Sequence, residues 1–407
     1  MSLSADKSFK MKMRDMENAF KYRRIPYPKR SVELIAILAI SCTFFLFMHT
    51  NKLNSRLKEM EVKLQPSEFS ALGLTGNQIN SRESSRRDNI YTLHGTYQYL
   101  KSTGQLKKLN VNNLNNTRKA EIDVLFFNRC AKVGSESLLE LFNNLGNFNL
   151  LNLEREGLGK ATKRQFTRYE QQELAETISE LNDGSVYIEH VNWIDFEIFN
   201  LPKPIYINLV RDPVERVISW YFYARGAYKN AIEYRKDPYK PLKPTEWYTK
   251  DFNECVRNGD PECQYVPYSV RDYVGNYKSQ TLFFCGHDDD CLPFNSPKAA
   301  QMAKEHVERE YAVVGSWEDT NVTLTVFEKY IPRFFNGAKL LFKIHNNEIT
   351  NRNKNKRKPK IDEDVKDMIR RNFTHEYDFY YFCKQRLYKQ YLAETLEDLP
   401  APRHLNI

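Results

Sequence analysis

The sequence contains 407 residues, of which 41% are hydrophobic and 13% aromatic, and its formal net charge is +9. A chain of this length and composition can bury a sizeable core, which excludes a wholly disordered protein. The positive charge suits an anionic partner such as nucleic acid, a nucleotide or an acidic polysaccharide. Charge alone does not select among these partners, because most basic residues of any protein are solvated surface.

An almost uninterrupted apolar run over residues 32–49 predicts a membrane anchor. A span of ~20 residues matches the thickness of the hydrocarbon layer. Residues 1–30 hold nine Lys or Arg against three acids, and positive residues stay on the cytoplasmic side. We therefore expect a cytoplasmic tail at 1–30, a transmembrane signal anchor at 31–50, and a lumenal remainder. A cleaved signal peptide is the alternative, but it needs an apolar run nearer the start and small residues at a cleavage site.

The segment after the anchor, residues 51–120, has the composition of a stem. Within residues 50–65, four apolar residues follow the four-three-four spacing of a coiled-coil seam, which predicts self-association. Residues 66–120 are rich in Ser, Asn, Gly and charge, as in a flexible linker. We expect the folded lumenal domain at 121–395 and a C-terminal tail at 396–407. Three N-x-[ST] sequons beyond the anchor are candidate glycosylation sites: Asn115, Asn321 and Asn372.

The cysteines also favour an oxidising compartment. Four of the seven form two close pairs: Cys255 with Cys263, and Cys285 with Cys291. Such pairs predict local disulfides that hold loops together. Zinc is the alternative, since His287 lies beside the second pair, but the spacings are not those of a zinc ribbon. Cys130 and Cys383 remain, either as thiols or joined to each other.

From residue 121 onwards, apolar runs alternate with segments of helical periodicity. Strands are predicted at 121–128, 185–191, 204–210 and 311–317, and helices at 135–146, 163–182, 213–226, 298–310, 322–335 and 361–391. The helix over 135–146 is expected to end at Gly146. A disulfide-pinned insertion at 230–297 interrupts the alternation. The pattern predicts an α/β fold with a central parallel sheet flanked by helices on both faces.

The first candidate site is the segment FFNRCAKVGSES at 126–137, where a buried strand ends and a helix begins. In an α/β sheet, free backbone N–H groups and the positive helix end make this location a phosphate site. Lys132 would add a charge, and Ser135 and Ser137 would add hydroxyl donors. The loop lacks the G-x-x-x-x-G-K-[ST] pattern of a Walker A motif. An ordinary serine-capped turn is the alternative interpretation.

The second candidate site is the segment PIYINLVRDPVERVISWYFYARG at 204–226. Arg211 stands at the carboxyl end of a buried strand, where open α/β sheets place ligands. Ser219 lies two helical turns later and can face the same way, so the pair suits one phosphate group. Arg216 falls on another face, where a salt bridge to a nearby acid is expected. Asp212 is predicted to cap the helix, with Pro213 at its first position.

The two candidate segments, a strand and loop with Lys132 and a second strand ending in Arg211-Asp212-Pro213, resemble those of the sulfotransferases that use 3′-phosphoadenosine 5′-phosphosulfate. The segment HV-x-x-x-DF at 190–196, FNECV at 252–256 and FFCGHDDDC at 283–291 are similar to the heparan sulfate and uronyl 2-O-sulfotransferases, and most of all to their insect Pipe branch. The resemblance covers roughly residues 122–392. It implies the P-loop-like fold of this family, a glycosaminoglycan or related glycan as acceptor, and a single-pass type II protein of the Golgi membrane.

The resemblance also assigns roles to single residues. The first loop would hold the 5′-phosphosulfate of the donor through Lys132, Gly134, Ser135, Glu136 and Ser137, and the 3′-phosphate would be held by Arg211 and Ser219. Lys132 would also stabilise the negative charge that develops on the bridging oxygen. Because the donor brings its own leaving group, no metal is expected. A nucleic acid partner is not expected either.

His190 lies near the end of a predicted strand that we expect to neighbour the strand of Arg211. A neutral histidine can accept the proton of a sugar hydroxyl without a large pKa shift. A lone histidine in a strand is more often structural, but the family places its catalytic base at this position. The heparan sulfate enzymes carry a second histidine where this chain has Ile188, a departure that bears on the acceptor.

The acceptor end of the predicted site is less well matched. Arg129 and Arg225 are the candidates for binding the acceptor's carboxylate or sulfate. The basic tract at 351–358 is either a loop that closes over nucleotide and polymer or a solvated surface run. Two other functions stay open at this point. One is an inactive glycan-binding module that keeps the fold, and the other is a P-loop kinase, which would need a glycine-rich loop and a magnesium carboxylate.

Overall fold

A computed structural model of the chain describes residues 91–155, 165–239, 241–270, 278–351 and 358–397. The predicted cytoplasmic tail, anchor and coiled-coil seam lie outside these residues. Most of the predicted C-terminal tail and of the basic tract also lies outside them. No helix within the described ranges is long and apolar enough to cross a membrane.

The centre of the fold is a five-stranded sheet with the order β2-β3-β1-β4-β5, in which every neighbouring pair is parallel. The strands are β1 (Leu125–Asn128), β2 (Asn152–Arg155), β3 (Ser185–Glu189), β4 (Ile205–Val210) and β5 (Tyr311–Ser316). All residues of β1, β4 and β5 are buried, as expected for strands covered on both faces. The predicted parallel sheet is confirmed. The polar edge strand β2 was not predicted.

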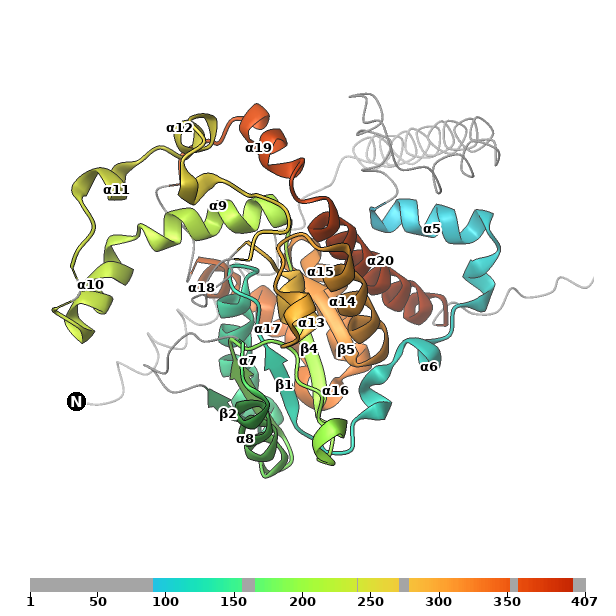
Figure 1. The fold of residues 1–407 in the computed structure, drawn as a ribbon. Coiled ribbons are helices and arrows are strands. Elements are labelled where there is room, and N and C mark those ends of the chain that lie inside the picture. The colour runs from blue at the N-terminus through green and yellow to red at the C-terminus, as the bar shows by residue number, and fades with distance from the viewer. Residues whose placement is uncertain (1–90, 156–164, 240, 271–277, 352–357, 398–407) are drawn as a thin grey trace, which may run out of the picture. The chain divides into compact units, whose positions relative to one another are not determined.

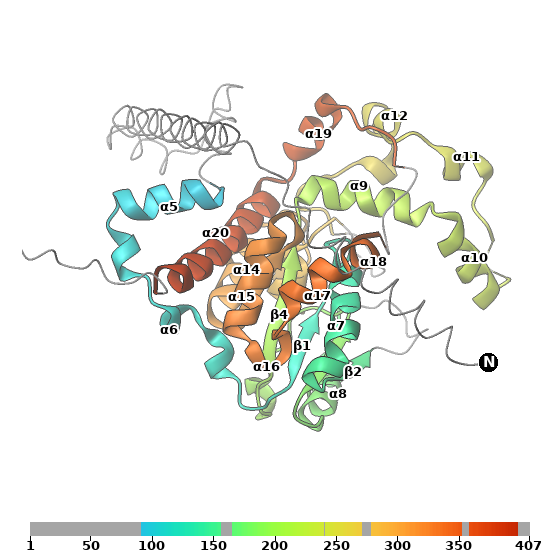
Figure 2. The same cartoon turned by 180° about the vertical axis from the view of Figure 1, so that it is seen from behind.

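Helices cover both faces of the sheet. Figure 1 shows α8 and α14 on the viewer's side, and Figure 2 shows α7, α16 and α17 on the opposite side. The helices around the sheet are α7 (Ser135–Asn149), α8 (Arg168–Ser179), α14 (Pro297–Arg309), α15 (Thr320–Tyr330), α16 (Pro332–Phe335), α17 (Ala338–Ile344), α18 (Asn346–Asn351) and α20 (Thr374–Glu397). This alternation of faces is the arrangement of right-handed parallel crossovers.

The helix that follows β4 forms as its sequence predicts. Helix α9 (Pro213–Ala224) begins with Pro213, and the Asp212 carboxylate accepts a hydrogen bond from the Glu215 N–H at 2.9 Å. Proline has no N–H to leave unsatisfied in the first turn, and an aspartate satisfies one that would otherwise be orphaned. The start of α9 is thereby fixed at Pro213, and only Arg211 and Asp212 separate it from the buried strand.

Three predicted helices have different ends in the structure. Helix α7 continues past Gly146, and its C-terminal cap is Leu150 in the left-handed conformation, whose N–H donates to Gly146. The predicted helix at 322–335 breaks at Ile331 into α15 and α16, because Pro332 cannot donate the next helical hydrogen bond. The predicted helix at 361–391 divides into α19 (Glu363–Arg370) and α20.

The folded domain begins before the predicted boundary at residue 121. Residues 93–119, expected to be flexible stem, form α5 (Leu93–Ser102), α6 (Val111–Leu114) and two short 3-10 turns. The asparagines that suggested a linker cap these elements instead, since Asn110 and Asn115 accept hydrogen bonds from backbone N–H groups. Asn116 donates to the Tyr311 carbonyl at 3.0 Å, which ties this segment to β5.

The insertion between α9 and α14 contains both predicted disulfides, Cys255–Cys263 and Cys285–Cys291. Its helices are α10 (Ala227–Lys236), α11 (Thr245–Thr249), α12 (Phe252–Arg257) and α13 (Thr281–Cys285). His287, the candidate zinc ligand, accepts a hydrogen bond from the Phe166 N–H at 2.8 Å instead. Cys130 and Cys383 are buried thiols that are not joined to each other.

Candidate active site

Three neighbouring strands end at the same edge of the sheet, and each is followed by a candidate residue. His190 follows β3, the loop at 129–134 follows β1, and Arg211 follows β4. The expectation that the strand of His190 neighbours that of Arg211 is wrong, because β1 lies between them. The loop that carries Lys132 therefore occupies the middle of the site, with His190 on one side and Arg211 on the other.

The middle loop turns sharply before it enters α7. Lys132 has a φ of 66° and Gly134 a φ of 95°, the left-handed region that side chains other than glycine rarely adopt. Helix α7 begins at Ser135 without a side-chain cap. The first N–H groups of a helix have no partner within it, and they lie at its positive end. The loop therefore presents backbone donors and Lys132 together, as a phosphate site requires.

The Lys132 side chain lies over an aromatic ring, and a second cation contacts the Lys132 backbone. Its Nζ lies 4.0 Å from the centre of the Tyr223 ring, which belongs to α9. The Arg211 guanidinium donates to the Lys132 carbonyl at 3.2 Å. Burial, followed by the charge of Arg211, lowers the pKa of the Lys132 amine from 10.5 to about 8. An ammonium destabilised in this way gains more from a bound anion than an exposed lysine does.

His190 is oriented by the same loop. Its Nδ1 lies 2.9 Å from the Arg129 carbonyl oxygen. A carbonyl can only accept a hydrogen bond, so this contact places the proton on Nδ1 and leaves Nε2 as the basic nitrogen. The contact fixes both the tautomer and the direction of the ring, which are the requirements for a general base.

Arg211 precedes α9 and Ser219 lies within it, with the acid Glu215 between them in sequence. The Glu215 carboxylate is 3.9 Å from the Arg211 guanidinium, and it also pairs with Lys358 at 2.7 Å and Lys366 at 3.2 Å. Ser219 lies one turn after Glu215 on the same helical face, and it is nearly buried. The acid between the predicted phosphate pair is thus bound by Lys366, which was not predicted, and by Lys358, the last residue of the basic tract at 351–358.

Arg216, for which a salt bridge was expected, donates a hydrogen bond to the loop after β1. It is 1% exposed and its NH1 donates to the Ala131 carbonyl at 3.3 Å. The helix after β4 thereby supports the loop after β1. Serines of the loop also have structural contacts, since the Ser137 hydroxyl donates to the Ile349 carbonyl at 2.9 Å. Ser135 is buried at the start of α7.

The two arginines predicted to bind the acceptor are occupied by protein groups. Arg129 is 3% exposed, and its guanidinium pairs with the Glu136 carboxylate at 2.6 Å. Glu136, predicted to bind the donor, thus pairs with Arg129 of the loop, and it also pairs with Arg155 of β2 at 3.4 Å. Arg225 pairs with Glu262 at 2.7 Å, and its guanidinium lies 3.4 Å from the centre of the Tyr221 ring. These contacts give both arginines structural roles, and their binding of the acceptor stays a prediction.

Several residues that support the site were not predicted. The Asp212 N–H donates to Glu318 at 3.0 Å, and the Tyr377 hydroxyl donates to the Asp212 carboxylate at 2.8 Å. The Trp317 indole donates to the Gly134 carbonyl at 2.6 Å. All three partners come from beyond β5 and lie more than 100 residues from the groups they bind. No local periodicity marks such contacts.

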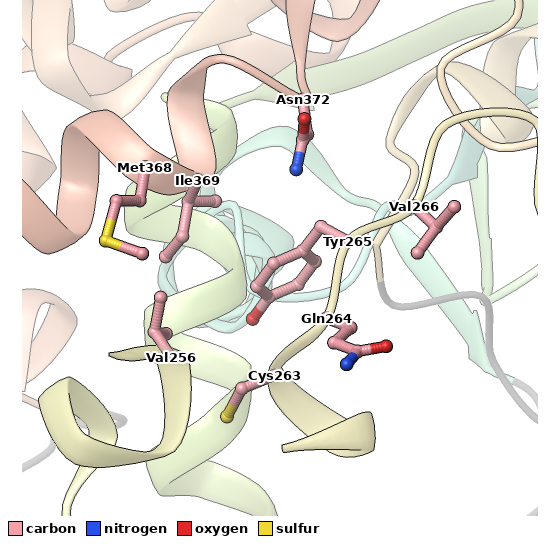
Figure 3. Close-up of a pocket in the computed structure, with 8 residues that line it drawn as sticks. All are labelled: Val256, Cys263, Gln264, Tyr265, Val266, Met368, Ile369 and Asn372. Carbon is pink, nitrogen blue, oxygen red and sulfur yellow. The ribbon is translucent and has the colours of Figure 1, made fainter. Parts of the chain in front are cut away.

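A pocket of about 170 Å³ lies elsewhere, between the first disulfide loop and α19 (Figure 3). Its lining consists of Val256, Cys263, Gln264, Tyr265, Val266, Met368, Ile369 and Asn372. Among these, Asn372 is a predicted glycosylation site. None of the predicted donor or catalytic residues lines this pocket, so it does not compete with the strand edge as the candidate active site.

Comparison with known proteins identifies the family. The profile of the sulfotransferase family matches residues 115–382. The chain is 43% identical to the uronyl 2-sulfotransferase homolog pip of Drosophila melanogaster, over 97% of this chain and 95% of that protein. The chain belongs to the sulfotransferase family. The resemblance inferred from the motifs is thereby confirmed. The alternative of a nucleotide kinase is not supported.

Two further relatives of this sulfotransferase carry related names. It is 26% identical to the uronyl 2-sulfotransferase of Homo sapiens, over 64% of this chain and 62% of that protein. It is 34% identical to the heparan sulfate 2-O-sulfotransferase 1 of Mus musculus, over 41% of this chain and 42% of that protein. The chain is therefore an enzyme of the sulfotransferase class with relatives in both 2-sulfotransferase groups.

Replacing Gly134 with alanine is expected to destabilise the sulfotransferase by about 1–3 kcal/mol beyond backbone strain. A Cβ on Gly134 would lie 1.8 Å from the Trp317 ring, so the ring or the loop must move. Gly104→Ala is the matched control, because Gly104 also has a positive φ but no heavy atom within 4 Å of its Cβ position. Urea unfolding measures both variants, and equal losses of stability would show that the Trp317 contact is unimportant.

Proposed function

We propose that this sulfotransferase moves a sulfuryl group from 3′-phosphoadenosine 5′-phosphosulfate to a hydroxyl of a glycosaminoglycan or related glycan. The acceptor position would be the 2-O position of a uronic acid, and the compartment the Golgi lumen. One observation carries the proposal. His190 and Arg211 follow the two strands on either side of β1, and both side chains contact the backbone of the loop that holds Lys132. The names of the relatives support the class of acceptor.

The donor suits the groups at this edge. Backbone N–H groups at the start of α7 and the Lys132 ammonium match a 5′-phosphosulfate. The Arg211 guanidinium and the Ser219 hydroxyl match a 3′-phosphate, because a guanidinium binds phosphate through two parallel hydrogen bonds. In the proposed arrangement, the two phosphate groups lie on either side of the contact between Arg211 and the Lys132 carbonyl.

In the proposed reaction, Nε2 of His190 takes the proton of the acceptor hydroxyl as its oxygen bonds to sulfur. The bond between sulfur and the bridging oxygen breaks, and 3′-phosphoadenosine 5′-phosphate leaves with the electron pair. Lys132 stabilises the charge that develops on the bridging oxygen, because a fixed ammonium in a partly buried site needs little reorganisation. Burial of Lys132 and its lowered pKa agree with this role.

The Golgi placement rests on the sequence and on surface features. The apolar segment at 31–50 is the proposed anchor. Two sequon asparagines, Asn321 and Asn372, are exposed, and Asn115 is partly exposed, so each is proposed as a glycosylation site. The two disulfides agree with an oxidising lumen.

The direct test is a transfer assay with the purified full-length chain. Donor labelled in its sulfuryl group is incubated with heparan, dermatan and chondroitin chains, each also in a 2-O-desulfated form. The proposal expects label in uronic acid 2-O-sulfate on disaccharide analysis. Label at another ring position would refute the proposed acceptor site. Binding of 3′-phosphoadenosine 5′-phosphate without transfer to any acceptor would instead favour the inactive glycan-binding alternative.

A further inference from the structure

Helix α13 contacts the ends of the strands that form the candidate active site. Its Phe283 carbonyl accepts hydrogen bonds from Asn128, the last residue of β1, and from the Trp193 N–H, both at 2.9 Å. The carbonyl of Gly286, which caps the end of α13, accepts a hydrogen bond from the Asn192 side chain at 2.9 Å. Figure 1 shows α13 in front of β4, between this strand and α14. The helix therefore joins the segment after His190 to the end of β1.

The residue before α13 makes the link to β4. The Gln280 side chain is fully buried. Its Nε2 donates to the Arg211 carbonyl at 3.1 Å, and its Oε1 accepts from the Arg211 N–H at 3.3 Å. One amide thus satisfies both backbone groups of the residue at which the strand turns into α9. Because these groups set the direction of the Cα–Cβ bond, Gln280 sets where the guanidinium leaves the sheet.

A carboxylate of the C-terminal helix α20 holds Gln280 in place. The Glu376 carboxylate of α20 is 1% exposed, and it accepts from the Gln280 N–H at 2.9 Å and from the Ser279 hydroxyl at 2.6 Å. At the other end, α13 closes with the Cys285–Cys291 disulfide. A buried carboxylate that loses a donor is left with an uncompensated charge, so this anchor opposes movement of Gln280.

We propose that Gln280 is a positioning residue of the donor site, which aims the Arg211 guanidinium at a phosphate of the donor. The inference rests on the proposed function and extends it to a residue outside the strand–loop motifs. Gln280 acts through the backbone of Arg211, so it affects donor binding before any effect on transfer. Its role is separate from that of the cysteines, which hold the helix but do not contact Arg211.

The test is Gln280→Glu, which keeps the shape of the side chain. A protonated carboxyl can reproduce both hydrogen bonds, whereas an ionised one cannot donate to the Arg211 carbonyl. Burial raises the pKa of such a carboxyl, so it should titrate within an accessible range. Calorimetry with 3′-phosphoadenosine 5′-phosphate and the full-length chain gives Kd at each pH. We expect the variant to match the wild type near pH ~5.5 and to bind about tenfold more weakly near pH ~8.5.

The matched control is Gln264→Glu in the same insertion. Gln264 also donates its side-chain amide to a backbone carbonyl, that of Gly259, but it is exposed and does not contact Arg211. Its ratio of Kd to the wild-type Kd should stay flat with pH. Gln280→Asn, which keeps the amide but shortens its reach, should weaken binding equally at every pH. This second variant still tests the inference if Gln280→Glu unfolds at high pH.

The outcomes separate the inference from the proposed function. If the wild type binds the nucleotide and Gln280→Glu matches it at every pH, Gln280 does not position Arg211. A pH-independent loss of affinity in Gln280→Glu would also overturn the role, because it would reflect general disruption of the fold. If the wild type itself does not bind the nucleotide, the proposed donor fails together with the inference.

Discussion

His190→Ala is expected to lower kcat by about 10³-fold and to leave the Kd of 3′-phosphoadenosine 5′-phosphate within about twofold of the wild type. The reason is the contact between Nδ1 and the Arg129 carbonyl, which leaves Nε2 to take the proton of the acceptor. Alanine removes that base but none of the groups proposed to hold phosphate. Single-turnover transfer measures the first quantity, and calorimetry measures the second.

His306→Ala is the matched control for this prediction. His306 also places Nδ1 against a backbone carbonyl, that of Phe284 at 2.8 Å, but it lies on α14 and not at a strand end. This variant should keep kcat within about threefold of the wild type. A His190→Ala variant that retains more than about a tenth of wild-type transfer would rule out His190 as the base.

Replacing Lys132 should separate activity from stability. Lys132→Met is expected to reduce transfer by about 10³-fold, because the developing charge on the bridging oxygen loses its partner. In the wild type, kcat/KM for the donor should fall as the pH rises through about 8, where the Lys132 amine loses its proton. Lys132→Arg should lack this alkaline fall, since a guanidinium stays charged. Initial rates across the pH range measure all three proteins.

The same pKa predicts an effect of opposite sign on stability. The folded state binds the Lys132 proton more weakly than the unfolded state, because the pKa falls from 10.5 to about 8 on folding. The destabilisation is fully present below about pH 8, and it disappears as the pH rises towards 10.5. Lys132→Met should therefore raise Tm at neutral pH while it reduces transfer by about 10³-fold. A variant that is both inactive and less stable would show that the ammonium is not destabilised by folding.

The sequence predicts those parts of the fold and site whose causes are local. The buried runs of β1 and β4, the cap Asp212 and the helix start at Pro213 all act within one turn of the chain. For this reason the sequence predicts Lys132 just after a buried strand and Arg211 at the end of another, and the structure has them after β1 and β4. The broken helix at Ile331 has a local cause as well, in Pro332, which a stricter interpretation of the sequence would have used.

The sequence gives no sign of the partners that several predicted site residues have in the fold. Arg225 was expected to bind acceptor, but Glu262 lies 37 residues away in sequence and pairs with it. Arg129, the other predicted acceptor ligand, pairs with Glu136, 7 residues further along the chain. Burial of an arginine with one acid depends on how the loop and the insertion fold back, and composition or spacing gives no measure of that. The acceptor site therefore remains a prediction of class, and the donor site remains a prediction that names its residues.

The contacts made by α20 bear on when the enzyme becomes active during synthesis. Glu376 fixes the residue that holds Arg211, and Tyr377 fixes the cap of α9. Both catalytic candidates emerge from the ribosome more than 160 residues earlier, since His190 and Lys132 precede them in the chain. A nascent chain that already contains every proposed donor ligand thus still lacks the helix that aligns them. Substitutions in α20 should accordingly behave as active-site lesions, although no residue of that helix is proposed to touch a substrate.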